Sequence, residues 1–442
     1  MYESNDADGR QRPAVVVRPP GPKSQALSAR LAASQAPMGP RPDPAARVRG
    51  IVLARGVGAN VYDVDGNRYV DLAAGFGALL IGHSHPRIER RLAVQASCLT
   101  QALGDVYPSD VKVRCAERVA ALHPAGHARV IFGQSGADAV TAALQSATLA
   151  TGKSGWISFR GAYHGLSYAP LAACGLRESY RAPFAAQLNQ RVYFVDYPRD
   201  LDGAREALGQ ATRVLETGGI GSVLIEPILG RGGCVVPPEG FLCELHELCR
   251  RMGALLIVDE IWTGLGRAGQ WLYCGRAGIC PDFVCLGKGL GGGVPISACV
   301  GRAELMQHWS RDDEVVHAST FAGAPLACAA ALETLDIIEE EQLVTRSREI
   351  GERWRAELAD ALRSFAPTLS VRGDGLMVAI DLGDRPGAAS QLLYDLLTRG
   401  YLASTGGGRR EVLVMTPPLT VDPVLLEGFV APLQQSLHAL AL

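Results

Sequence analysis

PDFVCLGKGLGGGVPISACVG (residues 281–301) and ALLIVDEIWTGLGR (residues 254–267) are the two stretches that decide the fold of this 442-residue chain. Each contains a short, nearly continuous apolar run, and the runs lead to Lys288 and Asp259. Runs of this kind are typical of strands that helices cover on both faces. Open α/β sheets bind ligands at the carboxyl ends of their strands, so we expect both polar side chains to face one site.

Further apolar runs alternate with helical patterns along the middle of the chain, which indicates an open, mostly parallel α/β sheet. The other runs are RVIFG (129–133), WISF (156–159), RVYFVDY (191–197) and SVLIEP (222–227).

The pattern divides the chain into four segments. Residues 1–45 lack sustained periodicity and are expected to form a partly disordered arm, with a possible short helix at 24–33. Residues 46–84 are expected to form the N-terminal part of a small domain, and within them residues 56–75 alternate apolar and polar side chains around an Asp-Gly turn, which predicts a hairpin. Residues 85–330 carry the large sheet, and residues 331–442 are expected to form a smaller α+β domain.

Composition favours a small-molecule partner. The chain has 43 basic and 45 acidic residues, so it carries no electrostatic footprint for nucleic acid or an anionic membrane. No window approaches the roughly 18 apolar residues of a membrane span, and the start is polar, so a cytoplasmic enzyme is expected. The 11 cysteines are scattered through apolar runs without zinc-ligand spacing, which predicts reduced thiols and no metal site.

Lys288 lies among glycines, so a ligand can approach its amine closely, and burial would lower its pKa toward that of a usable nucleophile. Gly287, Gly289 and Gly292 also match G-x-G-x-x-G, which keeps a NAD-dependent dehydrogenase as a remote alternative. Pro295 and a strand-like run follow where that motif requires a helix. A phosphate-binding P-loop is excluded, because Gly289 stands where the motif needs Ser or Thr.

Two more motifs follow strands. Ser135 and Gly136 open an alanine-rich helix whose first N–H groups suit a phosphate, although Ser-Gly-Ala-Asp is also an ordinary helix cap. Tyr163 and His164 lie in FRGAYHG, where an aromatic face suits a planar cofactor and packing alone is the plainer interpretation. Taken alone, Asp259 is more simply interpreted as an acid that ends a strand and caps a turn.

The order and spacing of these motifs resemble the class III (ornithine/GABA/omega-type) aminotransferases of the fold-type I pyridoxal-phosphate group. The resemblance covers roughly residues 45–440. It implies a large domain with a seven-stranded, mostly parallel sheet, and a small domain built from the N-terminal hairpin and the C-terminal α+β part. The motifs are GQSGADAV, FRGAYHG, IEPILG, IVDEIWTGLGR, LGKGLGGGVP, HASTFAGAPLACAAAL and TPPL.

The resemblance also implies roles for individual residues. Lys288 would form the Schiff base with pyridoxal 5'-phosphate and carry the proton, and Asp259 would pair with the pyridine nitrogen so that the ring acts as electron sink. Thr320 would reach the phosphate of the neighbouring subunit's cofactor, which implies a homodimer with shared active sites. Tyr163 and His164 would lie against the cofactor, Ser135, Gly136 and Ala137 would hold its phosphate, and Glu226 would support Asp259.

Three positions depart from the family pattern. Trp262 stands where many members carry a glutamine that contacts the phenolic oxygen of the cofactor. Arg231 and Val414 stand where the branch with a Glu–Arg switch has its glutamate and its arginine. Without that arginine the site lacks an evident bidentate clamp for an α-carboxylate. Arg231 either binds a carboxylate from another direction or is a surface charge.

The resemblance implies ping-pong transamination between a donor amine and an acceptor carbonyl. The missing switch, with phrases such as EPILGRGGC, resembles the enzymes that aminate sugar-derived aldehydes in aminoglycoside antibiotic pathways. Because fold does not settle reaction class, a pyridoxal-phosphate epimerase or racemase acting at an amine-bearing carbon stays open as an alternative.

Overall fold

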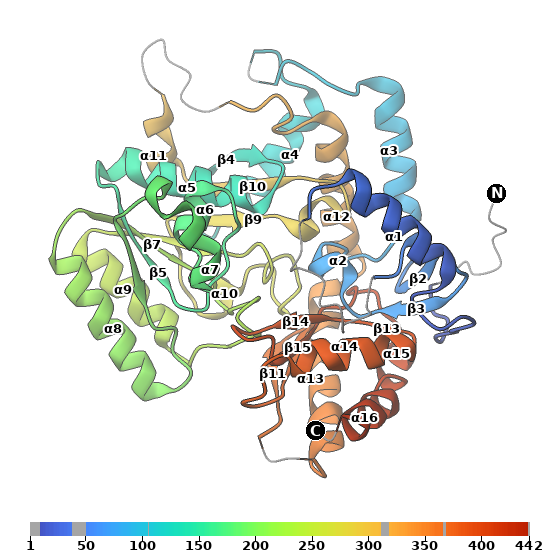
Figure 1. Ribbon diagram of the computed structural model, residues 1–442. Helices are drawn as coiled ribbons and strands as arrows, with labels where there is room; N and C mark the ends of the chain where they lie inside the picture. The colour runs from blue at the N-terminus through green and yellow to red at the C-terminus, as the bar shows by residue number, and fades with distance from the viewer. Residues whose placement is uncertain (1–8, 38–49, 105, 311–317, 366–367, 441–442) are drawn as a thin grey trace.

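The computed structural model describes residues 9–37, 50–104, 106–310, 318–365 and 368–440 (Figure 1). Its centre is a seven-stranded sheet in the order β4-β10-β9-β8-β7-β5-β6. The pairs from β9 to β6 are all parallel, and β10 runs antiparallel to both of its neighbours. This confirms the expected seven-stranded, mostly parallel sheet. The strands are β4 (Ala128–Gly133), β5 (Gly155–Phe159), β6 (Val192–Val195), β7 (Ile220–Ile225), β8 (Leu255–Asp259), β9 (Phe283–Leu286) and β10 (Ser297–Arg302).

Both faces of this sheet are buried, which explains why its strands are continuously apolar. On β7, Val223 and Ile225 pack into the core that includes α8 (Leu201–Glu216) and α9 (Phe241–Met252). Leu224, between them, packs into the separate core under α5 (Gly136–Thr151). Side chains alternate across a strand, so each of the two helical layers receives every second residue.

Other helices flank these layers, and Figure 1 shows α3 on the opposite side of the molecule from α8 and α9. They are α2 (Ala74–Gly77), α3 (Pro86–Cys98), α4 (Asp110–Ala120), α6 (Tyr168–Ala172), α7 (Glu178–Arg181), α10 (Tyr273–Arg276), α11 (Ala303–Met306) and α12 (Pro325–Glu340). Short 3₁₀ helices are η1 (Ala182–Gln187), η2 (Lys288–Gly291) and η3 (Gln307–Trp309).

Two four-stranded sheets lie beside the large one, ordered β1-β2-β3-β13 and β11-β12-β15-β14. The first joins both ends of the sequence, because β13 pairs in parallel with β3. Figure 1 shows the C-terminal elements in orange and red next to the blue N-terminal strands. The elements are β1 (Leu53–Val57), β2 (Asn60–Asp63), β3 (Arg68–Asp71), α13 (Leu343–Leu362), β11 (Ser370–Asp374), β12 (Met377–Asp381), α14 (Ala388–Thr398), β13 (Tyr401–Leu402), β14 (Ser404–Gly406), β15 (Val412–Met415), α15 (Pro423–Glu427) and α16 (Val430–Ala439).

Polar side chains of the hairpin hold the described part of the N-terminal arm. Asn60 exchanges two hydrogen bonds of 2.8 Å with the backbone of Gln11. The side-chain oxygen of Asn67 accepts from two successive backbone N–H groups at 2.8 Å. Asp65 accepts from the backbone of Lys23 and Ser24, in the first turn of α1 (Pro22–Ser34). The segment 9–37 is therefore docked on the hairpin, while residues 1–8 and 38–45 of the expected arm lie outside the described residues.

The eleven cysteines are all free thiols, as expected. Among the described residues no group of three or more His, Cys, Asp or Glu side chains is arranged to hold a metal ion. The described helices include none with the length and apolar character that a membrane crossing requires.

Candidate active site

Lys288 begins the tight turn that follows β9, and its backbone is in the left-handed region with φ of 41°. Non-glycine residues adopt this conformation at some cost, and such outliers gather at functional sites. A Cβ at the neighbouring Gly289 would lie 2.1 Å from Leu80 Cδ1, so only glycine fits there. Burial lowers the pKa of Lys288 to about 8, against the opposing attraction of Asp259 and Glu226. Roughly a tenth of its amine is therefore uncharged at pH 7.

Asp259 ends β8, and its backbone pairs with that of Cys285 on β9. One carboxylate oxygen, Oδ2, lies 2.8 Å from Nδ1 of His164, and the other accepts from the backbone N–H of Ile261 at 3.1 Å. Asp259 is 4% exposed, and His164 is 2% exposed. Because a carboxylate only accepts, the His164 ring must donate from Nδ1, which orients the acid.

Glu226 follows β7, the strand next to β8, so it lies close to Asp259. Its two oxygens accept from the backbone of Tyr163 at 2.7 Å and of Gly230 at 3.0 Å. Burial raises the pKa of Glu226 to about 7, with the negative charge of Asp259 adding to the effect. The Glu226 side chain thus links the loop that contains Tyr163 to the loop after β7.

The start of α5 offers backbone donors beside these residues. Ser135 and Asp138 cap the helix reciprocally, so the N–H of Ser135 is used by the Asp138 carboxylate at 2.9 Å. Within the described chain, the N–H groups of Gly136 and Ala137 have no recorded acceptor. These two free donors at a helix N-terminus suit a phosphate. A Cβ added at Gly287 would lie 3.6 Å from Gly136 Cα, so this loop adjoins the Lys288 turn.

An arginine between two aromatic rings forms another part of the site. The guanidinium carbon of Arg231 lies 5.3 Å from the ring centre of Tyr163 and 5.9 Å from that of Phe76. The described residues include no carboxylate in ion-pair contact with Arg231. Phe76 is 58% exposed and has φ of 59°, another left-handed outlier. The sequence analysis missed Phe76, and the small residues around it in AAGFGA were the available signal.

Trp262 lies between Lys288 and two glycines. The amine nitrogen of Lys288 is 4.4 Å from the centre of the Trp262 ring. A Cβ added at Gly77 would lie 2.3 Å from Trp262 Nε1, and one at Gly230 would lie 2.3 Å from Trp262 Cε3. The two glycines therefore confine opposite ends of the indole.

Val414 and Thr320 border this group. A Cβ at Gly406, beside Val414, would lie 3.3 Å from the Arg231 carbonyl oxygen, and Ser319, next to Thr320, accepts from the Gln134 side chain at 3.1 Å. Val414 is fully buried in β15, where its Cγ2 would be 2.8 Å from a Cβ at Gly406, so its side chain presents no surface to a substrate. Thr320 is exposed, and its carbonyl accepts from the side chain of Gln101 at 2.8 Å. The structure thus brings together Lys288, Asp259, His164, Glu226, Tyr163, Trp262, Arg231 and the start of α5.

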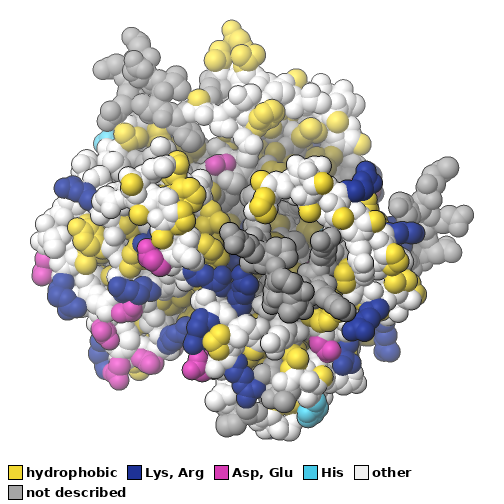
Figure 2. Space-filling view, viewed as in Figure 1, with side chains coloured by type: hydrophobic (Ala, Val, Ile, Leu, Met, Phe, Trp, Pro, Cys, Tyr) yellow, Lys and Arg dark blue, Asp and Glu magenta, His cyan; other side chains and the backbone are white. Residues whose placement is uncertain are grey.

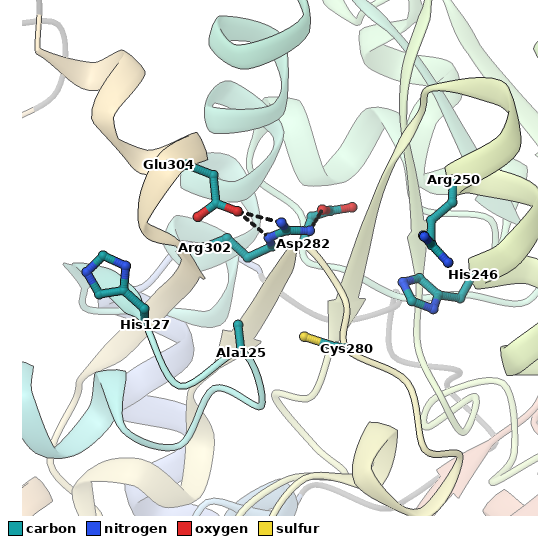
Figure 3. A pocket seen from close by; sticks show the side chains of 8 residues that line it. All are labelled: Ala125, His127, His246, Arg250, Cys280, Asp282, Arg302 and Glu304. Atoms are coloured by element: carbon teal, nitrogen blue, oxygen red, sulfur yellow. Dashed lines mark hydrogen bonds and ion pairs between the residues drawn. The ribbon is translucent and has the colours of Figure 1, made fainter.

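A cavity of about 370 Å³ lies elsewhere, at the opposite edge of the sheet, where β4 and β9 begin (Figure 3). Its charges are largely paired, because Arg302 contacts both Asp282 and Glu304. None of the residues described above lines it. The lining residues are Ala125, His127, His246, Arg250, Cys280, Asp282, Arg302 and Glu304.

Residues 43–437 match the family described as aminotransferase class-III. The chain belongs to the class III aminotransferases. It is 34% identical over 386 residues to an acetylornithine aminotransferase of Methanosarcina acetivorans, which covers 87% of this chain and 91% of the relative. An alanine/serine racemase of Pyrococcus horikoshii is 30% identical, covering 94% and 90%. The ornithine aminotransferase structure from Toxoplasma gondii has a TM-score of 0.84 and 30% identity, covering 94% of both chains.

The enzyme is therefore a fold-type I, pyridoxal-phosphate-dependent aminotransferase. The residues present fit this cofactor: the buried Nε2 of His164 and Nε1 of Trp262 lack partners in the described chain, and the Gly136 and Ala137 N–H groups are free. The dehydrogenase alternative is wrong, since the glycine-rich turn leads into antiparallel β10 and the family is a different one.

Proposed function

We propose that this aminotransferase takes an amino group from a carboxylate-bearing donor such as glutamate and passes it to a sugar-derived aldehyde that lacks an α-carboxylate. The proposal rests on the distribution of charged side chains in the site. Arg231 is a cation without a carboxylate partner in the described chain, and it faces Tyr163. The position where the switch branch has its arginine holds Val414, which is fully buried. One carboxylate clamp is therefore available to the donor, and the second substrate finds none at Val414.

The walls of the site support a bulky, ring-shaped second substrate. Trp262 offers an aromatic surface at the Lys288 amine, and Tyr163 and Phe76 offer two more beside Arg231. Pockets lined by aromatic groups with few polar ones bind ring-shaped molecules well. A substrate carboxylate buried without a paired cation would lose several kcal/mol of hydration, roughly a few powers of ten in specificity. Ornithine and GABA are therefore expected to be poor substrates.

In the proposed mechanism, the bound cofactor supplies an electron sink. Asp259 would pair with the pyridine nitrogen, and His164 fixes the orientation of the Asp259 carboxyl group through its 2.8 Å contact. Lys288 would take the proton from the substrate carbon and return it, a task that its pKa of about 8 suits near neutral pH. Glu226 keeps Tyr163 and the loop after β7 in place.

Phosphate binding is assigned to the start of α5, with Ser135 as the helix cap and Gly136 and Ala137 as backbone donors. Thr320 is assigned to the phosphate of a second copy of the chain. Exposed apolar side chains of the loop between α3 and α4 support a homodimer, and in Figure 2 hydrophobic side chains protrude at the top of the molecule, over this loop. Leu103, Val106 and Tyr107 are each more than 60% exposed, and Phe321 beside Thr320 is 57% exposed. An enzyme that is active as a stable monomer would contradict this assignment.

The test compares half-reactions with glutamate, ornithine, GABA and a neamine-type amine in wild type, Arg231→Ala and the surface control Arg213→Ala. Loss of a charge-assisted contact of about 1.5–3 kcal/mol should lower kcat/KM for glutamate roughly 10- to 150-fold in Arg231→Ala. The neamine-type amine should change less than about threefold. If ornithine is the best substrate and Arg231→Ala loses it selectively, the carboxylate-free assignment is wrong and Arg231 is the clamp for ornithine.

Racemisation or epimerisation at an amine-bearing carbon is the second candidate, favoured by the similarity to the Pyrococcus racemase. The two reactions differ in their stoichiometry. Transamination consumes one carbonyl acceptor for each amine formed, whereas racemisation exchanges the carbon-bound hydrogen with solvent and consumes none. Turnover of a single chiral amine in D₂O without an added carbonyl acceptor separates them, since lasting deuterium incorporation with inversion indicates the second reaction.

A further inference from the structure

Trp262 occupies a position where a polar side chain would serve the cofactor in many class III enzymes, and its surroundings fix it tightly. The indole is 5% exposed, and its two ends face Gly77 and Gly230 without room for a Cβ on either glycine. The aromatic face that results lies against the Lys288 amine, 4.4 Å from nitrogen to ring centre. This distance is within the range of a cation–π contact.

The charged groups around Lys288 have opposing effects on the protonation of its amine. Asp259 at the end of β8 and Glu226 after β7 attract the ammonium form, whereas Arg231 repels it. No carboxylate of the described residues comes within ion-pair distance of the Lys288 amine. The indole face is thus the direct contact that favours a positive charge at this nitrogen, in a setting where burial disfavours it.

We propose that Trp262 is a positioning residue for Lys288: the face of its indole holds the amine and favours its protonated form. The proposal rests on the assignment of Lys288 as the cofactor-binding, proton-carrying lysine. Trp262 holds the protonated amine of Lys288 in one position within the site. Lys288 therefore retains the proton that it must return to the reacting carbon.

The experiment uses holoenzyme treated with the amino donor, which releases Lys288 from the cofactor. The rate of Lys288 acetylation by acetic anhydride is followed against pH by peptide mass spectrometry, with the exposed Lys23 as internal reference. The variants are Trp262→Phe and Trp262→Leu. The matched control is Trp354→Leu, another buried tryptophan whose Nε1 lacks a partner in the described chain, located in α13 and packed on Phe429.

Trp262→Leu should lower the pKa of Lys288 by roughly half a unit to one and a half units, the shift that a cation–π contact of ordinary strength produces. Trp262→Phe keeps an aromatic face and should lower it less. Trp354→Leu should leave it within about 0.2 units of wild type. An unchanged or raised pKa in Trp262→Leu overturns the proposal, as does an equal fall in the control.

Gly230→Ala provides an independent variant that keeps the tryptophan. Its φ is not in the left-handed region, so the added methyl group acts mainly through its 2.3 Å approach to the indole. It should shift the Lys288 titration in the direction of Trp262→Leu and add nothing when combined with that substitution. Additive shifts in the double variant would contradict the mechanism. Failure of the Lys288 assignment itself is recognised separately, because the visible cofactor band would then survive Lys288→Ala.

Discussion

The contact between His164 and Asp259 permits a sharp test, because two substitutions separate its hydrogen bond from its bulk. His164→Phe keeps a buried ring but removes the donor that lies 2.8 Å from the Asp259 carboxylate. His164→Asn is smaller, yet its amide nitrogen stands at the same distance along the side chain as Nδ1. The Asn variant therefore preserves the donor, and the Phe variant preserves the packing.

The expected loss of activity follows from the number of donors that form hydrogen bonds with Asp259. The carboxylate has two partners, His164 and the backbone of Ile261, and it is almost wholly buried. A hydrogen bond to a charged group contributes about 1.5–3 kcal/mol, which corresponds to roughly 10- to 150-fold. His164→Phe should lose about that factor in kcat/KM, whereas His164→Asn should lose less than about tenfold.

The assay measures kcat/KM and, by titration of the visible band, the dissociation constant of the cofactor. Chemical unfolding of each variant serves as a control for stability. The reasoning is refuted if the Phe and Asn variants agree within about twofold in both quantities, since bulk alone would then account for the role of His164.

Other expectations concern the lysine, the buried glutamate and the subunit contact. Lys288→Ala should abolish the visible cofactor band and turnover together, while Lys153→Ala changes neither, as absorption spectra and steady-state rates will tell. The raised pKa of Glu226 means that the folded chain keeps a proton which the unfolded chain releases, so this contribution to stability is complete below about pH 4.5 and is lost as pH rises to about 7. The fall is at most about 3 kcal/mol, and denaturant unfolding at several pH values should find it absent in Glu226→Gln. Thr320→Val should weaken cofactor binding about tenfold in an intact dimer, and an unchanged affinity would remove Thr320 from the phosphate site.

The large sheet was predictable because its strands are buried on both faces and therefore consist of nearly uninterrupted runs of apolar residues. Asp259 and Lys288 were predictable for a related reason, since each lies directly after such a strand. The environment of Trp262 was not, because Gly77 and Gly230 are distant in sequence and neither shows locally what it must accommodate. The burial of Val414 was not predictable either, because it depends on the pairing of β15 with β12 and β14.

The pairing of β13 with β3 affects the order in which the chain acquires its structure. Tyr401 and Leu402 complete a sheet whose other strands end at Asp71, so that sheet remains open along one edge until nearly the whole polypeptide has been synthesised. Closure of so long a loop is slow compared with local pairing. Truncation before residue 401 should thus leave the β3 edge unpaired from Val70 onward, beyond the bridge between Arg68 and Ala14, and prone to aggregation, although every strand of the large sheet is already present.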